Sequence, residues 1–561
     1  MKLYKTKPFK HQHRALDLSK DKEVFALLME QGTGKSKVIV DTIAYLWRAG
    51  KIDFVQIVAP KGVAPGWVRQ QIPTHMPDDV PYVAALWKTS LSKTRQKELQ
   101  KLLARTDVLR IVVMNTEAFG ASEKAVDFAI DALDSAQSAM VVVDESHRIK
   151  SPQAKTTKRI LLHVRPRCRF RRILTGTVGD KPFDLFSQFG FLDPAIIGVD
   201  SFTAFKGEYA EMIPPESGAM RHIASRLMKL KKGGPLVHTG KYYDEETGAL
   251  TDQARSADGI KNKPQMLPKF LPQLVATNPD GTPRYRDLDK LQRLVAPHSY
   301  RVLKADCLDL PEKLYNRYYT ELTDQQWSLY NEVKEEQRIE WEEGRVSVFN
   351  KLTVYLRLQQ IICGYIPDDD RLVELFKSWG ENPRICSTLE LIGDRPDGER
   401  AIIWCRFRED IRRMAQALKE SYGSGSVVEF HGGVSDRDRI ENVARFQGVR
   451  ENMDKKGNFI SSEEVPEAER ARFMIAQQQS GGVGQTWTAA NLSLHYSNMF
   501  SLIDRLQAED RPHRIGQKRA VQYIDIEAED TIDSVIIGSL VAKKEVADVL
   551  NGDEGSNWLK L

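Results

Sequence analysis

Two stretches of the chain alternate short runs of apolar residues with longer segments of helical periodicity. In residues 1–200 the apolar runs are VFALLM (24–29), FVQIVAP (54–60), LRIVVMN (109–115), MVVVDE (140–145) and RRILTGT (171–177). Continuous Val, Ile and Leu runs that end in polar residues or glycine are typical of buried parallel strands, whose carboxyl ends carry the functional site. The pattern returns over 401–524 in AIIWCRF, VVEFHGG, FMIAQQ, LSLHYSN and VQYIDI. The sequence therefore predicts two parallel α/β lobes.

The regions between and within these stretches have a different composition. Residues 211–286 are rich in Gly, Pro and Lys, residues 324–362 have helical periodicity with many Gln, Glu and Arg side chains, and residues 448–470 are highly charged. We interpret these regions as insertions on two α/β cores. The expected organisation is a first lobe over 1–200, an insertion and return to the first lobe over 201–320, a helical linker over 321–383 and a second lobe over 384–561.

Composition narrows the class of protein. The 561 residues carry 82 Lys and Arg against 77 Asp and Glu, a net charge of +5, so any nucleic-acid binding has to come from local patterning. Five scattered cysteines form no Cys-x-x-Cys pair, which argues against a disulfide framework or a zinc knuckle. The chain has no long apolar run and no apolar signal core, which predicts a soluble, cytoplasmic protein without membrane contact.

A glycine-rich segment lies between the first apolar run and a segment of strong helical periodicity. It reads Gly32-Thr33-Gly34-Lys35-Ser36. Glycines let backbone N–H groups curl around phosphates, lysine reaches the β and γ oxygens, and serine ligates Mg²⁺. The longer form of this motif has Gly or Ala where this chain has Met29, so the match is to the shorter form. The segment predicts a phosphate-binding loop; the alternative is a plain turn before a helix.

Two acidic residues, Asp144 and Glu145, follow the apolar run MVVV. A carboxylate at a strand end can hold Mg²⁺, and the next one can act as general base on an attacking water. Alone they would also fit a solvated turn, but together with Lys35 they favour an ATP site. Gln12 precedes the loop, and its side-chain amide is able to read the adenine edge, although a lone Gln is more often a surface residue.

Near the C-terminus, Gln507 is followed by Arg511 and Arg514. The two arginines are three residues apart, so on a helix they would share one face. We expect this segment to be the second half of the ATP site. Gln507 would help to sense the γ-phosphate, and the arginines would stabilise its charge when the lobes close.

The order of these segments carries a resemblance to a known family. In chain order they are Gln12, GTGKS (32–36), IVAPKGVAPGW (57–67), VVMNTEAF (112–119), DESHRIKS (144–151), LTGT (174–177), QQSGGVGQTWTAAN (478–491) and QAEDRPHRIGQ (507–517). They resemble the helicase motifs of superfamily 2. DESHRIKS and SYRVLKADCLDLPEK (299–313) are similar to signatures of the Swi/Snf-type DNA translocases. The resemblance implies an α/β fold of two RecA-like parallel lobes with mostly helical insertions, ATP and Mg²⁺ as cofactors, and a nucleotide contact from Gly484.

Two departures refine the resemblance. Val178 stands where the family usually has Pro after Leu-Thr-Gly-Thr, and the usual Trp-Asn-Pro ahead of the last motif is absent. This version looks like the compact stand-alone members of bacteria and their viruses. It implies a monomer in the cytoplasm of a bacterial cell or a virus-infected host cell, with the insertions as the surface for any protein partner.

Candidate DNA contacts lie at the ends of the predicted strands, where small residues and hydroxyls let backbone N–H groups approach phosphates. They are Lys61, Asn115, Thr116, Thr175, Gly176, Thr177, Arg406, His431, Gly432, Ser480 and Gly481. Thr175–Thr177 would equally fit a link between the lobes, Gly432 a plain turn, and the cluster Lys229–Lys232 a solvated loop. We interpret Trp67 and Trp404 as packing residues.

The favoured function is a DNA-stimulated ATPase that translocates on double-stranded or branched DNA without sequence preference, driving branch migration or strand annealing. One alternative is a strand-separating DNA or RNA helicase, since the same ATP motifs would serve. Another is an ATP-dependent, protein-displacing switch that works through a partner.

Overall fold

The computed structural model describes two units of the chain. The described residues are 3–88, 93–213, 238–243, 250–251, 266–268, 275–277, 283–342, 348–368, 371–396, 398–453, 459–479, 486–551 and 553. The first unit comprises Met1–Asp200, Leu288–Glu321 and Phe376–Leu561, and it contains both predicted lobes. The second comprises Ser201–Asp287 and Leu322–Leu375. Each unit is therefore described by itself.

The first lobe is built on a seven-stranded parallel sheet with the order β10-β1-β6-β5-β2-β4-β3. Its strands are β1 (Val24–Met29), β2 (Phe54–Ala59), β3 (Tyr82–Leu86), β4 (Leu109–Asn115), β5 (Ala139–Asp144), β6 (Phe170–Leu174) and β10 (Ser299–Val302). The five apolar runs predicted as strands are all strands, so this part of the prediction is confirmed. β3 and β10 are additional strands at the two edges.

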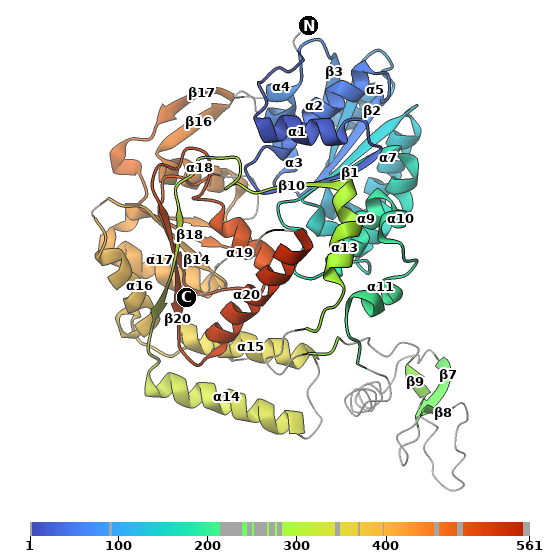
Figure 1. Ribbon diagram of the computed structural model, residues 1–561. Helices are drawn as coiled ribbons and strands as arrows, with labels where there is room; N and C mark the ends of the chain where they lie inside the picture. The colour runs from blue at the N-terminus through green and yellow to red at the C-terminus, as the bar shows by residue number, and fades with distance from the viewer. Residues whose placement is uncertain are drawn as a thin grey trace. The chain divides into compact units, whose positions relative to one another are not determined.

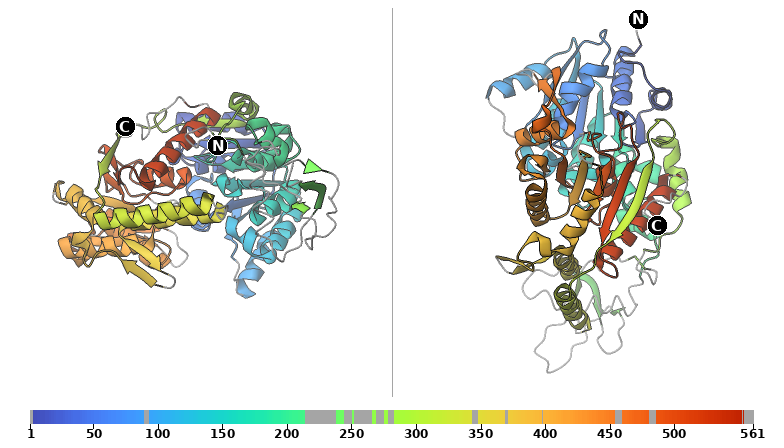
Figure 2. Two further views of the ribbon diagram at one scale, coloured as in Figure 1. Left: turned by 90° about the horizontal axis from the view of Figure 1, so that it is seen from below. Right: turned by 90° about the vertical axis from the view of Figure 1, so that its left-hand side faces the viewer.

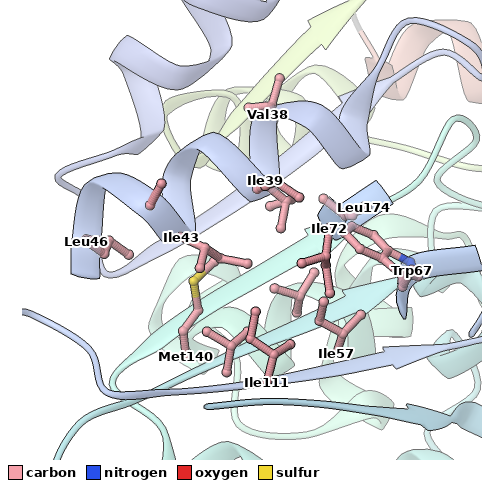
Figure 3. Close-up of a cluster of buried hydrophobic side chains, with 14 of the residues drawn as sticks. Val38, Ile39, Ile43, Leu46, Ile57, Trp67, Ile72, Ile111, Met140 and Leu174 are labelled. Atoms are coloured by element: carbon pink, nitrogen blue, oxygen red, sulfur yellow. The ribbon is translucent and has the colours of Figure 1, made fainter. Parts of the chain in front are cut away.

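Helices cover this sheet (Figure 1). They are α1 (Lys10–Ser19), α2 (Lys35–Arg48), α3 (Ala64–Gly66), α4 (Ile72–His75), α5 (Lys93–Leu103), α6 (Thr116–Ala121), α7 (Glu123–Asp134), α8 (Lys155–Arg159), α9 (Asp184–Leu192), α10 (Pro194–Ile197) and α13 (Leu288–Val295). The short η1 (Trp67–Gln71) joins α3 to α4, and η2 (Ser146–Ile149) lies between β5 and α8. Figure 3 shows Ile39 and Ile43 of α2 above Ile57 and Ile111 of the strands, with Trp67 in the same buried cluster.

The second lobe is built on a six-stranded parallel sheet with the order β11-β20-β19-β14-β18-β15. Its strands are β11 (Lys313–Tyr319), β14 (Ala401–Cys405), β15 (Val427–Phe430), β18 (Phe473–Gln477), β19 (Leu492–His495) and β20 (Val521–Glu527). Its helices are α16 (Pro383–Gly393), α17 (Arg408–Tyr422), α18 (Asp436–Gln447), α19 (Leu502–Glu509) and α20 (Ile532–Asn551). Two parallel α/β lobes are thus confirmed. Trp404 stacks on Trp487 at 5.4 Å in the core, and both are fully buried.

The segment 299–319 contributes to both sheets. β10 pairs with β1 of the first sheet, whereas β11 pairs with β20 of the second sheet. Figure 2 shows β11 running beside the red β20. The crossing between the lobes therefore lies between Val302 and Lys313. At the other end of the chain, α20 packs against α13.

The insertions include strands as well as helices. Residues 448–470 contain an antiparallel hairpin of β16 (Val449–Met453) and β17 (Phe459–Glu464). The second unit holds α11 (Phe202–Tyr209), α14 (Asp324–Glu342), α15 (Val348–Cys363), the pair β12 (Tyr365–Asp368) and β13 (Arg371–Glu374), and the small sheet β7 (His238–Tyr243), β8 (Leu250–Thr251) and β9 (Met266–Pro268). Within the described residues, none of the helices has the length and apolar character that a membrane span requires.

Candidate functional site

The glycine-rich loop connects the end of β1 to the start of α2. Gly32 and Gly34 have φ angles of +82° and +90°, in the left-handed region that glycine adopts without a steric penalty. Gly34 is the N-cap of α2, which begins at Lys35. The loop therefore ends at a helix N-terminus, where free N–H groups and the helix dipole favour an anion. The Ser36 side chain lies in the first turn of the same helix.

Lys35 lies buried at the end of β1. Its ammonium donates hydrogen bonds to the carbonyls of Met29 (2.8 Å) and Glu30 (3.3 Å). Burial lowers the pKa of Lys35, while the carboxylates of Glu145 and Asp144 oppose that change. The lysine and the two acidic residues predicted from separate segments thus act on one another electrostatically.

Gln12 and His11 hold α1 against the loop. The Gln12 side chain accepts a hydrogen bond from the Phe9 N–H (3.0 Å) and donates one to the Thr33 carbonyl (3.0 Å). The His11 ring nitrogen Nε2 lies 2.8 Å from the same carbonyl. A Cβ atom on Gly34 would overlap the Gln12 amide nitrogen. The structure therefore places Gln12 directly beside the glycine-rich loop.

The acidic pair lies at the carboxyl end of β5. Asp144 Oδ2 accepts a hydrogen bond from the Trp67 indole (2.8 Å), and Oδ1 accepts one from the Glu145 N–H (2.9 Å). Burial, together with the charge of Glu145, raises the pKa of Asp144 to about 6. Glu145 has a φ of +50°, which is uncommon for a residue with a side chain.

His147 sets the ionisation of Glu145. Burial opposes ionisation, yet the adjacent His147 and the charge of Lys35 bring the pKa of Glu145 below its usual value. The His147 ring nitrogen Nδ1 lies 3.3 Å from Glu145 Oε2. Glu145 is therefore the member of the acidic pair that loses its proton more readily, which suits a general base.

The arginine pair lies beyond the end of α19. We expected Arg511 and Arg514 on one face of a helix, but α19 ends at Glu509 and the pair lies in the turn that follows. The reason is Pro512, because proline disfavours the helical region for the residue before it and lacks an N–H. The shared-face argument was wrong.

The turn nevertheless brings both arginines to the first half of the site. Burial lowers the pKa values of Arg511 and Arg514, and the carboxylate of Glu145 opposes both shifts. Arg514 Nη2 donates to Gln31 Oε1 of the phosphate loop at 3.4 Å. Gln507 is buried on α19, and no described contact joins it to the loop.

Lys304 and Arg301 connect the two halves, and the sequence analysis assigned them no role. Lys304 Nζ donates to Asp510 Oδ1 (2.5 Å) and to the His513 carbonyl (2.9 Å). The Lys304 N–H donates to Glu30 Oε2 at 2.7 Å. Arg301 donates to the carbonyls of Leu28 (3.0 Å) and Gly176 (2.9 Å) and to Asp553 Oδ2 (2.8 Å). The sequence signal for these contacts was the spacing Arg301-x-x-Lys304. It lies within the segment 299–313, which was used only as a family signature.

The segment after β6 packs against the phosphate loop. Thr175 is fully buried, and its hydroxyl donates to the Thr177 carbonyl (2.5 Å). A Cβ atom on Gly176 would lie 3.1 Å from Gln31. The Val178 carbonyl, at the position of the usual proline, accepts a hydrogen bond from Gln188 (2.5 Å). Gln188 also accepts one from Ser146 at 2.6 Å, which links this segment to the acidic pair.

The remaining candidate DNA contacts lie after strands of both sheets. Lys61 is exposed after β2, and its N–H donates to Glu117 Oε2 (3.0 Å). Asn115 ends the neighbouring β4, and the next residue, Thr116, is buried. In the second sheet the candidates are Arg406 after β14, and His431 and Gly432 after β15. Because every strand is parallel, each group lies at the carboxyl edge of its own sheet. Ser480, Gly481, Gly484 and Lys229–Lys232 lie outside the described residues.

Comparison with known proteins gives one family. A family model described as the SNF2-related domain matches residues 11–365. The chain is 26% identical over 260 residues to an uncharacterized ATP-dependent helicase, MG018, of Mycoplasma genitalium, covering 46% of this chain and 23% of that protein. It is 24% identical over 558 residues to the DNA annealing helicase and endonuclease ZRANB3 of Bos taurus, covering 97% of this chain and 41% of that protein. The chain thus spans less than half the length of either relative.

A solved structure is also similar. The Sulfolobus solfataricus SWI2/SNF2 ATPase core in complex with double-stranded DNA aligns over 98% of both chains, with 17% sequence identity and a TM-score of 0.36.

Proposed function

The chain belongs to the SNF2-related domain family, and from this premise we propose that it is a DNA-stimulated ATPase that translocates on double-stranded DNA. The observation that carries the proposal is the convergence of three separate segments on one site. Lys35 of the loop and the two arginines after α19 each interact electrostatically with Glu145 after β5. Such a site can require both lobes for hydrolysis, which is the basis of a motor.

The residues present fit a nucleotide with Mg²⁺. Lys35 already directs its ammonium at two carbonyl oxygens, and phosphate oxygens would take their place. We assign the phosphates to Gly32, Thr33, Gly34 and Lys35, adenine to Gln12 and, from the family resemblance, a further nucleotide contact to Gly484. The Ser36 hydroxyl and the Asp144 carboxylate are oxygen ligands of the type Mg²⁺ prefers. When bound, the ion would neutralise charge on the phosphates.

Hydrolysis would depend on the Glu145 carboxylate and on the two arginines that feel its charge. Glu145, ionised through His147 and Lys35, accepts a proton from the attacking water. Arg511 and Arg514 stabilise the charge that develops on the transferred group. Gln507 would sense the γ-phosphate through α19, which carries it close in sequence to both arginines.

For DNA we propose contacts at the carboxyl edges of both sheets. Lys61 and Asn115 would serve the first sheet, and Arg406, His431 and Gly432 the second, with Ser480 and Gly481 beside them in sequence. The sequence also predicts DNA contacts from the residues that follow β4 and β6, which are Thr116, Thr175, Gly176 and Thr177. Because Thr175 is buried and Gly176 packs on Gln31, we now propose that this segment couples DNA contact to the phosphate loop through its backbone.

The test is ATP hydrolysis measured with single-stranded DNA, duplex DNA, forked DNA and RNA, with Lys35→Ala as the inactive control. Duplex DNA should stimulate hydrolysis most, and a triplex-displacement assay should show translocation on duplex. Strongest stimulation by single strands or RNA would support a strand-separating helicase instead. Duplex stimulation without displacement would support a protein-displacing switch.

A further inference from the structure

A buried indole donates a hydrogen bond to the proposed metal-binding carboxylate. Trp67 is fully buried and Asp144 is 6% exposed, and Trp67 Nε1 donates to Asp144 Oδ2 at 2.8 Å. We propose that Trp67 is a positioning residue that fixes the Asp144 carboxylate for Mg²⁺ and transmits the state of the Lys61 loop to it. The inference rests on the proposed role of Asp144 and deepens it.

Two donors fix the orientation of the Asp144 carboxylate. The Glu145 N–H bonds Oδ1 at 2.9 Å while Trp67 bonds Oδ2. One donor on each oxygen opposes rotation of the group, and each oxygen keeps further lone-pair capacity for a metal ion or its water. Partners that orient a metal ligand in this way typically change metal affinity by about 10–100-fold when they are removed.

Packing holds the indole in place, so that its bond can position the carboxylate. Trp67 begins η1 and lies in the core of the first lobe, where Figure 3 shows it beside Ile72 and Leu174. A buried indole N–H requires an acceptor, and Asp144 Oδ2 is that acceptor. The ring therefore has little freedom to move without the carboxylate.

The path from Trp67 to the surface is short. Only α3 and a tight turn separate it from Lys61, and the turn is closed by bonds from the Val63 and Ala64 N–H groups to the Pro60 carbonyl (2.8 and 2.9 Å). Lys61 is exposed and its backbone bonds Glu117 on α6. A DNA phosphate that binds Lys61 would therefore displace the segment 61–67, which ends at the indole. Trp67 is then one route by which DNA stimulates the ATPase.

The chain offers a matched control for the indole bond. Trp404 is also fully buried, and its Nε1 donates to Ser493 Oγ at 3.0 Å in the core of the second lobe. Trp67→Phe and Trp404→Phe each keep an aromatic ring and remove one buried N–H bond. Both should lower thermal stability to a similar degree, and only Trp67→Phe should affect the metal.

The measurement is binding of a fluorescent ADP analogue at increasing Mg²⁺, which involves no turnover. The Mg²⁺ concentration at half-maximal binding should rise about tenfold or more in Trp67→Phe and stay unchanged in Trp404→Phe. Stimulation of hydrolysis by duplex DNA should also fall selectively in Trp67→Phe. If Trp67→Phe does not fold, 3-benzothienylalanine at position 67, which replaces the N–H by sulfur at nearly constant shape, takes its place.

An unchanged Mg²⁺ midpoint in the folded variant would overturn the inference, as would equal shifts in both variants, since these would indicate a purely structural role. Absence of Mg²⁺-dependent nucleotide binding in the wild-type protein would instead refute the proposed function itself.

Discussion

The buried ion pair between Lys304 and Asp510 offers a sharp test of how the two halves of the site are joined. Lys304 follows β10 of the first sheet and Asp510 follows α19 of the second lobe. Their side chains are 4% and 6% exposed, and Nζ lies 2.5 Å from Oδ1. Removing one partner leaves the other charge buried, which typically costs about 3–5 kcal/mol. Lys304→Met and Asp510→Asn should therefore both destabilise the protein strongly.

The surroundings predict which variant loses more. Asp510 also feels the positive charges of Lys313 and Arg514, so it keeps partners when Lys304 is removed. The positive charge of Lys313 opposes that of Lys304, which keeps the charge of Glu30 and the neutral His513 carbonyl as partners when Asp510 is neutralised. Asp510→Asn should thus cost close to about 5 kcal/mol, and Lys304→Met close to about 3 kcal/mol. The double variant should cost about 1–3 kcal/mol less than the sum.

The assay is urea unfolding followed by circular dichroism and by tryptophan fluorescence, with the free energy of unfolding taken by linear extrapolation where the two signals coincide. The exposed pair of Lys20 and Asp17, with an N···O distance of 2.7 Å, is the control. Lys20→Met should change the free energy of unfolding by about 1 kcal/mol or less. If the single Lys304 and Asp510 variants were as mild as this control, or strictly additive, the pair would not form in solution and the reasoning would fail.

Two further predictions concern the loop and the pH dependence of stability. Gly34→Ala should weaken nucleotide binding by about tenfold or more, because φ is +90° and the new methyl group would displace the Gln12 amide. The control is Gly50→Ala, at φ +63° with open space around it, which should leave binding of the fluorescent ADP analogue unchanged. Burial, with the charge of Lys37, lowers the pKa of His75 from 6.5 to about 4. Between these pH values the unfolded chain binds a proton that the native state does not bind, so the free energy of unfolding should fall as pH drops from about 6.5 to about 4. His75→Gln should make this pH dependence less steep in urea titrations, and an unaltered slope would refute the assignment.

The strands that the sequence predicts are those buried on both faces. VFALLM and MVVVDE are continuous apolar runs, and a parallel sheet covered by helices requires such runs. β11 was not expected as a strand, because KLYNRYY alternates half-buried and exposed positions at the edge of the second sheet. β10 carries Arg301 and has only one fully buried residue. Edge strands lack the pattern on which the prediction depends.

The site shows the same division between local and long-range information. The glycine-rich loop before a helix and the acidic pair at a strand end could be predicted, because each combines a strand, a turn and specific residue types within one short segment. The Lys304–Asp510 and Trp67–Asp144 contacts join residues 206 and 77 positions apart, and no local pattern encodes them. The interpretation of Trp67 as a packing residue described its burial but omitted its hydrogen bond. The helix expected to continue through Arg511 ended before it because of Pro512.

The most direct test of the account is Arg514→Ala, measured for ATP binding and for duplex-stimulated hydrolysis. Arg519→Ala, which removes an exposed arginine paired with Glu399, is the matched control. The account predicts ATP affinity within about threefold of wild type and a loss of turnover of about 10³-fold or more, the contribution of an arginine at the γ-phosphate, with both quantities unchanged in the control. Turnover that survives in Arg514→Ala would contradict an ATP site completed by the second lobe.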